Sequence, residues 1–156
     1  MKEWVILIVD ERKDDLESLT ECFAQDYEVL SVRSGTEAMK SLENHDVDVI
    51  LTNLRLGDIS GLDLFRHSRI TRPEAIRILV AEHKYLEGIE HDINEAAVYQ
   101  VIRKPWHPTA LQLMVRRALE SRELARRHRY LNRALKFSDA IWNKNPGIAT
   151  ATPKQN

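Results

Sequence analysis

Residues 47–64 read VDVILTNLRLGDISGLDL. The run Val47–Thr52 is nearly continuous in Val, Ile and Leu, which is typical of a strand covered on both faces of a sheet. The polar residue Asn53 follows, then a turn-rich stretch, and then apolar residues at helical spacing from Leu62 onward. This order predicts a functional strand-to-loop junction at Asn53, where such folds usually carry an acid or a nucleophile rather than a neutral amide.

The rest of the first two thirds of the chain repeats this alternation. Further apolar, β-branched runs occur at Val5–Val9, Glu28–Val32, Ile76–Val80 and Val98–Ile102. The segments between the runs have helical spacing, with apolar faces predicted at Leu16, Leu19 and Phe23, at Ala38, Met39 and Leu42, at Leu62, Phe65 and Arg69, and at Tyr85, Ile89 and Ile93. Strictly alternating strands and helices predict an α/β fold, (βα)5, with a parallel sheet between two layers of helices.

The last helix is predicted to begin near Pro108 and to run without Gly or Pro to about Trp142. A helix of this length spans roughly 50 Å. Its first half has a broad apolar stripe that can cover a sheet, formed by Leu111, Met114, Val115, Ala118 and Leu119. Its second half has a narrower row, formed by Leu124, Leu131, Leu135 and Trp142, with His128 and Ser138 between them.

This narrower row has the 4-3 spacing of a short coiled coil and predicts a parallel helix pair across a two-fold axis. A solvated helical extension is the alternative. We therefore expect a globular domain over residues 1–122, a helical extension with coiled-coil character over 123–142, and a disordered polar tail over 143–156.

Composition limits the class of protein. The 156 residues are enough for one core, and the single Cys22 cannot form an internal disulfide. No run approaches the roughly 20 apolar residues that cross a bilayer, so a cytoplasmic protein without membrane contact is expected. Between residues 116 and 136 eight Lys/Arg and two Glu give a local net charge of +6, while the rest of the chain carries −7.

Ligands of open parallel sheets bind beyond the carboxyl ends of the strands. Asp10 and Glu11 close the first predicted strand, Asn53 closes the third, and Lys104 follows the fifth. Two carboxylates and a backbone carbonyl suit a hard divalent ion such as Mg²⁺. A lysine on a neighbouring loop could pair with the acids or hold a phosphoryl oxygen.

The stretches ILIVDE, DVILTNLRLGDISGLDL and IRKPW together resemble the receiver domain of two-component response regulators, over roughly residues 3–122. The resemblance implies a flavodoxin-like (βα)5 fold with strand order 2-1-3-4-5. It identifies Asp10 and Glu11 as the acidic pair, Lys104 as the family lysine and Asn53 as the position of the aspartyl phosphoacceptor. The backbone carbonyl of Arg55 would complete a metal site.

The positions that respond to phosphorylation in this family also differ here. Val80 stands where receivers usually place Thr or Ser, and Val101 stands where they place Tyr or Phe. Three changes at coupled positions indicate a natural pseudo-receiver, a non-enzyme that requires no cofactor and binds Mg²⁺ weakly at most, with Lys104 as counter-ion of the acids. An ordinary receiver with an engineered Asp-to-Asn change is the alternative.

The C-terminal part is most similar to receivers of hydrogenase regulators and of HD-GYP-linked proteins. In those proteins the last helix continues into an output domain, so the expected partner is another signalling protein or an output domain, together with a second copy of this chain. A second possibility is that the arginines contact nucleic acid, which would make binding steeply salt-dependent. It is less favoured, because the chain lacks a helix-turn-helix and has few aromatics for stacking. The arginines concerned are Arg116, Arg117, Arg122, Arg126, Arg127, Arg129 and Arg133.

Overall fold

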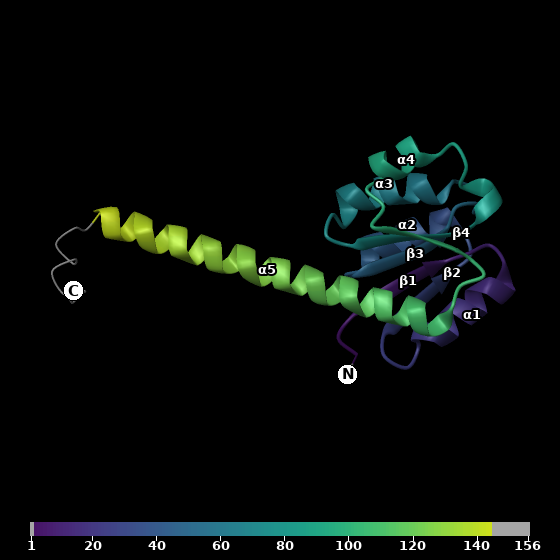
Figure 1. Ribbon diagram of the computed structural model, residues 1–156, viewed down its shortest axis with the longest axis horizontal. Helices are drawn as coiled ribbons and strands as arrows, with labels where there is room; N and C mark the ends of the chain where they lie inside the picture. Colours follow the sequence, from purple (N-terminus) through teal and green to yellow (C-terminus); the bar gives the residue numbers. More distant parts are fainter. Residues whose placement is uncertain (1, 145–156) are drawn as a thin grey trace. The chain divides into compact units, whose positions relative to one another are not determined.

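The computed structural model describes residues 2–144, which divide after Arg116 into two compact units. The first unit is built on a five-stranded parallel sheet with the order β2-β1-β3-β4-β5 (Figure 1). The strands are β1 (Val5–Val9), β2 (Glu28–Val32), β3 (Val49–Asn53), β4 (Ile76–Glu82) and β5 (Gln100–Lys104). The predicted flavodoxin-like fold and strand order are confirmed.

Helices follow each strand. They are α1 (Lys13–Phe23), α2 (Gly35–Asn44), α3 (Gly61–Thr71), α4 (Glu90–Glu95) and α5 (Pro108–Lys144). Figure 1 shows α1 and the first turns of α5 on one side of the sheet, and α3 and α4 on the other. No helix within residues 2–144 combines the length and the apolar character needed to cross a membrane.

The strand boundaries differ slightly from the prediction. β3 begins at Val49, two residues later than expected, because the Val47 N–H bonds to the His45 carbonyl as the chain leaves α2. β4 and β5 each run two residues further, to Glu82 and Lys104, and these two residues are partners in the β4–β5 register. The sheet therefore carries charged side chains at its carboxyl edge.

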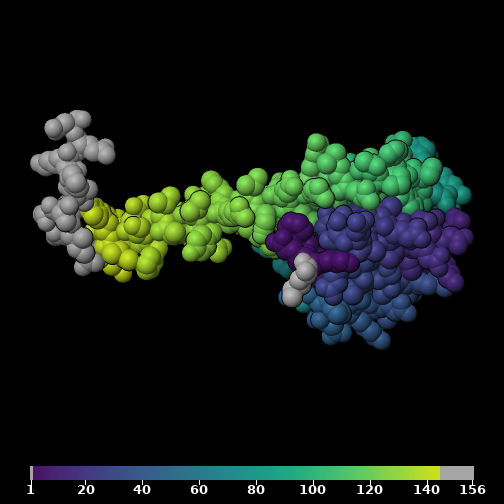
Figure 2. All heavy atoms as spheres, turned by 90° about the horizontal axis from the view of Figure 1, so that it is seen from below, coloured from purple at the N-terminus to yellow at the C-terminus, as the bar shows by residue number. Residues whose placement is uncertain are grey.

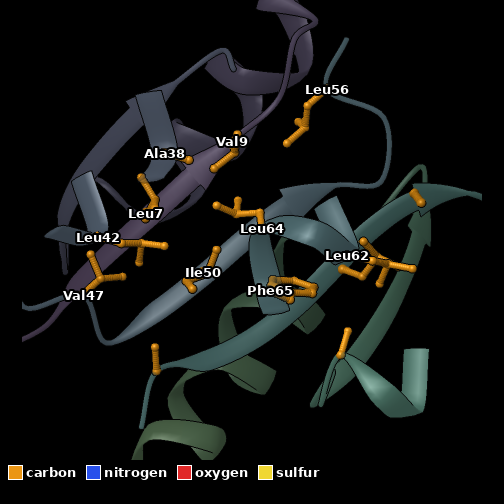
Figure 3. Close-up of a cluster of buried hydrophobic side chains, with 14 residues drawn as sticks. Leu7, Val9, Ala38, Leu42, Val47, Ile50, Leu56, Leu62, Leu64 and Phe65 are labelled. Atoms are coloured by element: carbon orange, nitrogen blue, oxygen red, sulfur yellow. The ribbon is translucent and has the colours of Figure 1, made fainter. Parts of the chain in front are cut away.

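The core on one face of the sheet lies against α2 and α3. Figure 3 shows Leu7 and Ile50, from neighbouring strands, beside Leu64 and Phe65 of α3. All four side chains are completely buried. Full burial of one such side chain contributes about 1.5–3 kcal/mol, so this face holds the strand ends at fixed positions.

The fourth helix is shorter than its apolar spacing predicted. Tyr85 ends a 3-10 turn over His83–Tyr85, and Ile89 precedes α4, so only Ile93 of the predicted face is helical. Gly88, at φ +78°, reverses the chain between the turn and the helix. Ile89 and Ile93 nevertheless pack against the core, because the break leaves both on the inner side.

Two arginines bind carbonyls at the carboxyl end of α4. Arg69 Nη1 donates to the Glu95 carbonyl at 2.6 Å, and Arg77 Nε donates to the Ala97 carbonyl at 2.9 Å. The spacing had placed Arg69 on the core face of α3, and this was wrong: its side chain is exposed. Burial lowers the pKa of Arg77.

The loop after β3 is tied to the start of α2. Ser34 caps α2, and its side-chain oxygen accepts the Glu37 N–H at 3.1 Å. The Asp58 carboxylate adds a second cap across the loop, accepting the backbone N–H groups of Gly35 at 3.0 Å and Thr36 at 2.9 Å. These N–H groups hold the pKa of Asp58 well below its ordinary range.

This tether predicts an acid-sensitive contribution to stability. Because the pKa of Asp58 is depressed in the folded protein, its contribution is present above the ordinary carboxyl value of 3.8 and is lost as the pH falls below that value. Asp58→Asn should lower the free energy of unfolding by about 1 kcal/mol at neutral pH, because the amide loses the charge and one of the two accepting oxygens. Urea unfolding at a series of pH values measures this.

The matched control is Glu43→Gln, on the far end of the same helix. It should leave stability nearly unchanged at every pH. An Asp58→Asn protein as stable as the parent at neutral pH would contradict the tether.

Candidate functional site

The candidate site lies where β1, β3, β4 and β5 end. In the sheet register Asn53 pairs with Val80, and Glu82 pairs with Lys104. Asp10 follows β1 directly and is completely buried. The predicted acid, amide and lysine therefore come together at one edge, as the (βα)5 topology requires.

The Lys104 ammonium lies between two carboxylates. Its Nζ is 2.7 Å from Asp10 Oδ2 and 2.8 Å from Asp15 Oδ2, and its side chain is only 9% exposed. The other carboxylate oxygen of Asp10 accepts the Arg12 N–H at 3.0 Å. Both oxygens of the buried acid thus have a donor, which burial of a charge demands.

Part of the predicted ion pairing was wrong. Lys104 was expected as counter-ion of Asp10 and Glu11, yet its second partner is Asp15. Glu11 is exposed and turns toward the loop after β3, where a Cβ on Gly57 would lie 2.9 Å from Glu11 Oε2. The signal for Asp15 was present in the sequence, because it lies one helical turn before Leu19 on the buried face of α1.

A second row of charges connects this cluster to the loop after β4. Arg12 lies 3.7 Å from Asp15 and 3.7 Å from Glu82, whose other oxygen is 3.4 Å from Lys84. Contact with Tyr85, and then with Glu82, raises the pKa of Lys84. The acids at this edge are therefore accompanied by cations from the same chain.

Asn53 uses its amide as a donor. Its Nδ2 donates to the Arg55 carbonyl at 3.0 Å, the carbonyl predicted as a metal ligand. Gly61 packs so closely that a Cβ there would lie 2.3 Å from the Asn53 carbonyl, which fixes the backbone of the junction. An aspartate could not make the same bond to Arg55, because an ionised carboxylate has no donor.

The two valines offer no polar group to the site. Val80 is completely buried next to Asn53 in the sheet, and Val101 is partly buried against the core. Neither side chain can hydrogen-bond an anion.

The residues at this edge fit Mg²⁺ poorly. Asp10 is held by a lysine ammonium, the Arg55 carbonyl accepts an amide N–H, and Glu11 is exposed and turned toward the loop after β3. Within residues 2–144 no group of at least three His, Cys, Asp or Glu side chains is arranged to hold a metal ion. Hard divalent ions prefer several oxygen ligands, and here most of them already have a donor.

The buried ion pair between Asp10 and Lys104 predicts that removing only the lysine lowers the free energy of unfolding more than removing both charges. Lys104→Met should lower the free energy of unfolding by about 3 kcal/mol, since it leaves the Asp10 charge buried with one backbone donor. The double variant Lys104→Met/Asp10→Asn should recover much of this loss, because the buried charge is gone. Chemical denaturation of each variant measures both effects.

The matched control is Asp15→Asn, which removes the more exposed carboxylate and leaves the inner pair intact. It should cost about 1 kcal/mol. Equal losses in Lys104→Met and Asp15→Asn would show that the inner pair has no special importance.

Comparison with known proteins agrees with the observed fold. The family model described as "Response regulator receiver domain" matches residues 6–116. The hydrogenase transcriptional regulatory protein HoxA of Bradyrhizobium diazoefficiens is 35% identical over 115 residues, which are 74% of this chain and 24% of that protein. HoxA of Cupriavidus necator is 33% identical over 79% of this chain and 26% of its own length. The chain thus spans about a quarter of these curated relatives.

Solved structures show the same fold. The signal receiver domain of an HD domain-containing protein from Pseudomonas fluorescens superposes with a TM-score of 0.74 at 28% identity, over 81% of this chain and 94% of that one. The receiver domain of a sensor histidine kinase from Pseudomonas aeruginosa, solved with magnesium in its active-site cleft, superposes with a TM-score of 0.68 at 22% identity, over 75% of this chain and 98% of that one.

Proposed function

Because this chain belongs to the response regulator receiver family, we propose that it is a pseudo-receiver, which transmits a signal by protein association without accepting a phosphoryl group. The observation that carries the proposal is the side-chain amide of Asn53, which donates to the Arg55 carbonyl at 3.0 Å. The amide occupies the position of the family's phosphoacceptor. It also places a hydrogen-bond donor where a metal ion would need a free oxygen.

The chemistry of phosphoryl transfer supports this proposal. A carboxylate can attack phosphorus and form an acyl phosphate, and a divalent cation then neutralises the crowded oxygens. The oxygen of a carboxamide is a poor nucleophile, and its product would carry an unfavourable charge. Asn53 also removes one anionic metal ligand, so Mg²⁺ should bind weakly at most.

The neighbouring positions favour a natural loss over a single laboratory change. Val80 lies beside Asn53 and lacks the hydroxyl that would bind a phosphoryl oxygen. Val101 lacks the aromatic ring that would change position on activation. An engineered Asp-to-Asn substitution would account for Asn53 alone and leaves both valines unexplained.

Phosphorylation assays separate these alternatives. Incubation with acetyl phosphate and Mg²⁺ should leave the intact mass of the parent chain unchanged, because no side chain at position 53 can form the acyl phosphate. Mass spectrometry under native conditions provides the measurement. The matched variant Asn53→Asp restores the nucleophile and should gain one phosphoryl group slowly.

Acquisition of a phosphoryl group by the parent chain would refute the pseudo-receiver. An Asn53→Asp variant that is phosphorylated and then changes its oligomeric state as ordinary receivers do would instead favour an engineered lesion.

The output is proposed to be self-association through the arm, defined here as residues 117–144 of α5. Its predicted seam residues are open to solvent: Leu131 is 58% exposed, Leu135 is 63% exposed, and Leu124 and Trp142 are exposed as well. Figure 2 draws the atoms of this segment as spheres coloured from green to yellow. Exposed apolar residues at this spacing mark an interaction surface.

Polar substitutions in the seam test this output. Leu131→Asn/Leu135→Asn should weaken dimerisation by roughly 100-fold or more, since each copy loses two apolar side chains from the interface. Light scattering across a concentration series measures the dissociation constant.

The matched control is Arg129→Asn/Arg133→Asn, which changes two residues of the basic face in the same helical turns. It should leave dimerisation intact or strengthen it slightly, because like charges are removed. Equal effects of the two double variants would contradict a seam through the leucines.

The partner is proposed to be a second copy of this chain together with another signalling protein or an output domain. The hydrogenase regulators that resemble this chain are about four times longer than the matched region. Their additional length leaves room for an output domain, which supports this proposal. Contact with nucleic acid is less well supported. The arm's basic residues also interact within the chain, as in the 4.0 Å pair of Arg126 with Glu123.

A further inference from the structure

The arm carries different chemistry on the two sides of its seam. One flank consists of the residues that precede His128, Leu135 and Trp142, namely Arg127, Ala134 and Ile141. The other flank consists of the residues that follow Leu124, Leu131 and Ser138, namely Ala125, Asn132 and Asp139. The first flank is mostly apolar and the second is mostly polar.

The apolar side is wider than the predicted seam. Beyond the first flank lie Tyr130 and Phe137, which are 73% and 69% exposed, and Ile141 is exposed as well. Beyond the second flank lie Arg122, Arg129 and Lys136. The apolar stripe of the arm therefore extends to one side of the seam only.

We infer that two arms pair antiparallel, with Leu131 of one copy opposite Leu135 of the second; this rests on the self-association proposed above. In a parallel pair, the first flank of one copy packs beside the second flank of the other copy. The apolar Ala134 and Ile141 would then lie beside the polar second flank, which includes Asp139. In an antiparallel pair, each flank packs beside the same flank of the second copy. Apolar then meets apolar, and polar meets polar, which is how flanking positions choose orientation.

One antiparallel register satisfies every seam position. With Leu131 opposite Leu135, Leu124 lies opposite Trp142, and His128 lies opposite Ser138, whose hydroxyl is a suitable hydrogen-bond partner for an imidazole. Ala134 then meets Ala134 of the second copy at the centre, where small side chains let the helices approach closely. The parallel arrangement expected from the 4-3 spacing alone would instead stack His128 on His128 and Trp142 on Trp142.

Charge favours the same orientation. On either side of the central Arg133, residues 122–132 carry four Arg and one Glu, a net charge of +3, whereas residues 134–144 carry two Lys and one Asp, a net charge of +1. A parallel pair places the +3 segments side by side. The antiparallel register places each +3 segment beside a +1 segment, which reduces repulsion between like charges.

Spin-label distances in the full chain test the orientation. Nitroxides are attached to Arg122→Cys or to Lys136→Cys in a Cys22→Ser background, and both positions occupy the same place on the helical repeat. In the antiparallel register residue 136 lies about 9 Å along the axis from its counterpart and residue 122 about 33 Å, at about 1.5 Å per residue. We therefore expect a short distance at 136 and a separation longer by roughly 20 Å at 122.

Equal short distances at both positions would overturn the antiparallel pairing and leave self-association standing. Absence of any intermolecular distance, together with a monomer by light scattering, would refute the self-association itself. Dilution with unlabelled chain must weaken the dipolar signal, which identifies it as intermolecular. Circular dichroism of each labelled variant verifies that the helix content is retained.

Discussion

The burial of one carboxylate governs the edge of the sheet where the site lies. Asp10 ends a central strand and is completely buried, so its charge must be compensated inside the protein. Lys104, at the end of β5, provides the compensation at 2.7 Å. In the sheet, β1 and β5 lie on either side of β3 and β4. The contact between Asp10 and Lys104 joins the ends of β1 and β5, and it therefore fixes the relative positions of the strand ends around Asn53.

The same pairing decides which ligands the edge can accept. A second acid, Asp15, shares the lysine, and Arg12 pairs with Asp15 and Glu82 at the mouth. Asp10, Asp15 and Glu82 thus have cationic partners from the same chain, while Asn53 donates to the Arg55 carbonyl. The buried acid at this edge is therefore already compensated by a cation of the same chain, which agrees with the proposal that the signal passes by association through the arm.

Much of this could be predicted from the sequence, because it depends on local patterns. β1 and β2 have the predicted bounds, and the long helix begins at Pro108 as expected. The order of the strands followed from the family resemblance. The motifs also located Asp10, Asn53 and Lys104, because residues that end parallel strands meet at one edge.

The errors arose where long-range contacts override local spacing. The fourth helix was predicted to be too long, because the turn at Gly88 breaks the helix although Ile89 and Ile93 still pack against the core. Glu11 was assigned to the lysine because it adjoins Asp10 in sequence, yet its side chain is exposed and turns toward Gly57 in the loop after β3. Asp15, four residues after Glu11, contacts the lysine because it lies in the first turn of α1. The tether from Asp58 to α2 joins residues more than 20 positions apart and has no local signal.

The edge around Asn53 should not respond to the reagents that activate receivers. This is tested by the amide NMR spectrum of the ¹⁵N-labelled chain, recorded before and after addition of Mg²⁺ with beryllium fluoride, a mimic of the phosphoryl group. We expect the side-chain amide of Asn53 and the backbone amides of Arg55 and Lys104 to keep their chemical shifts. Saturable shifts at these residues would contradict it.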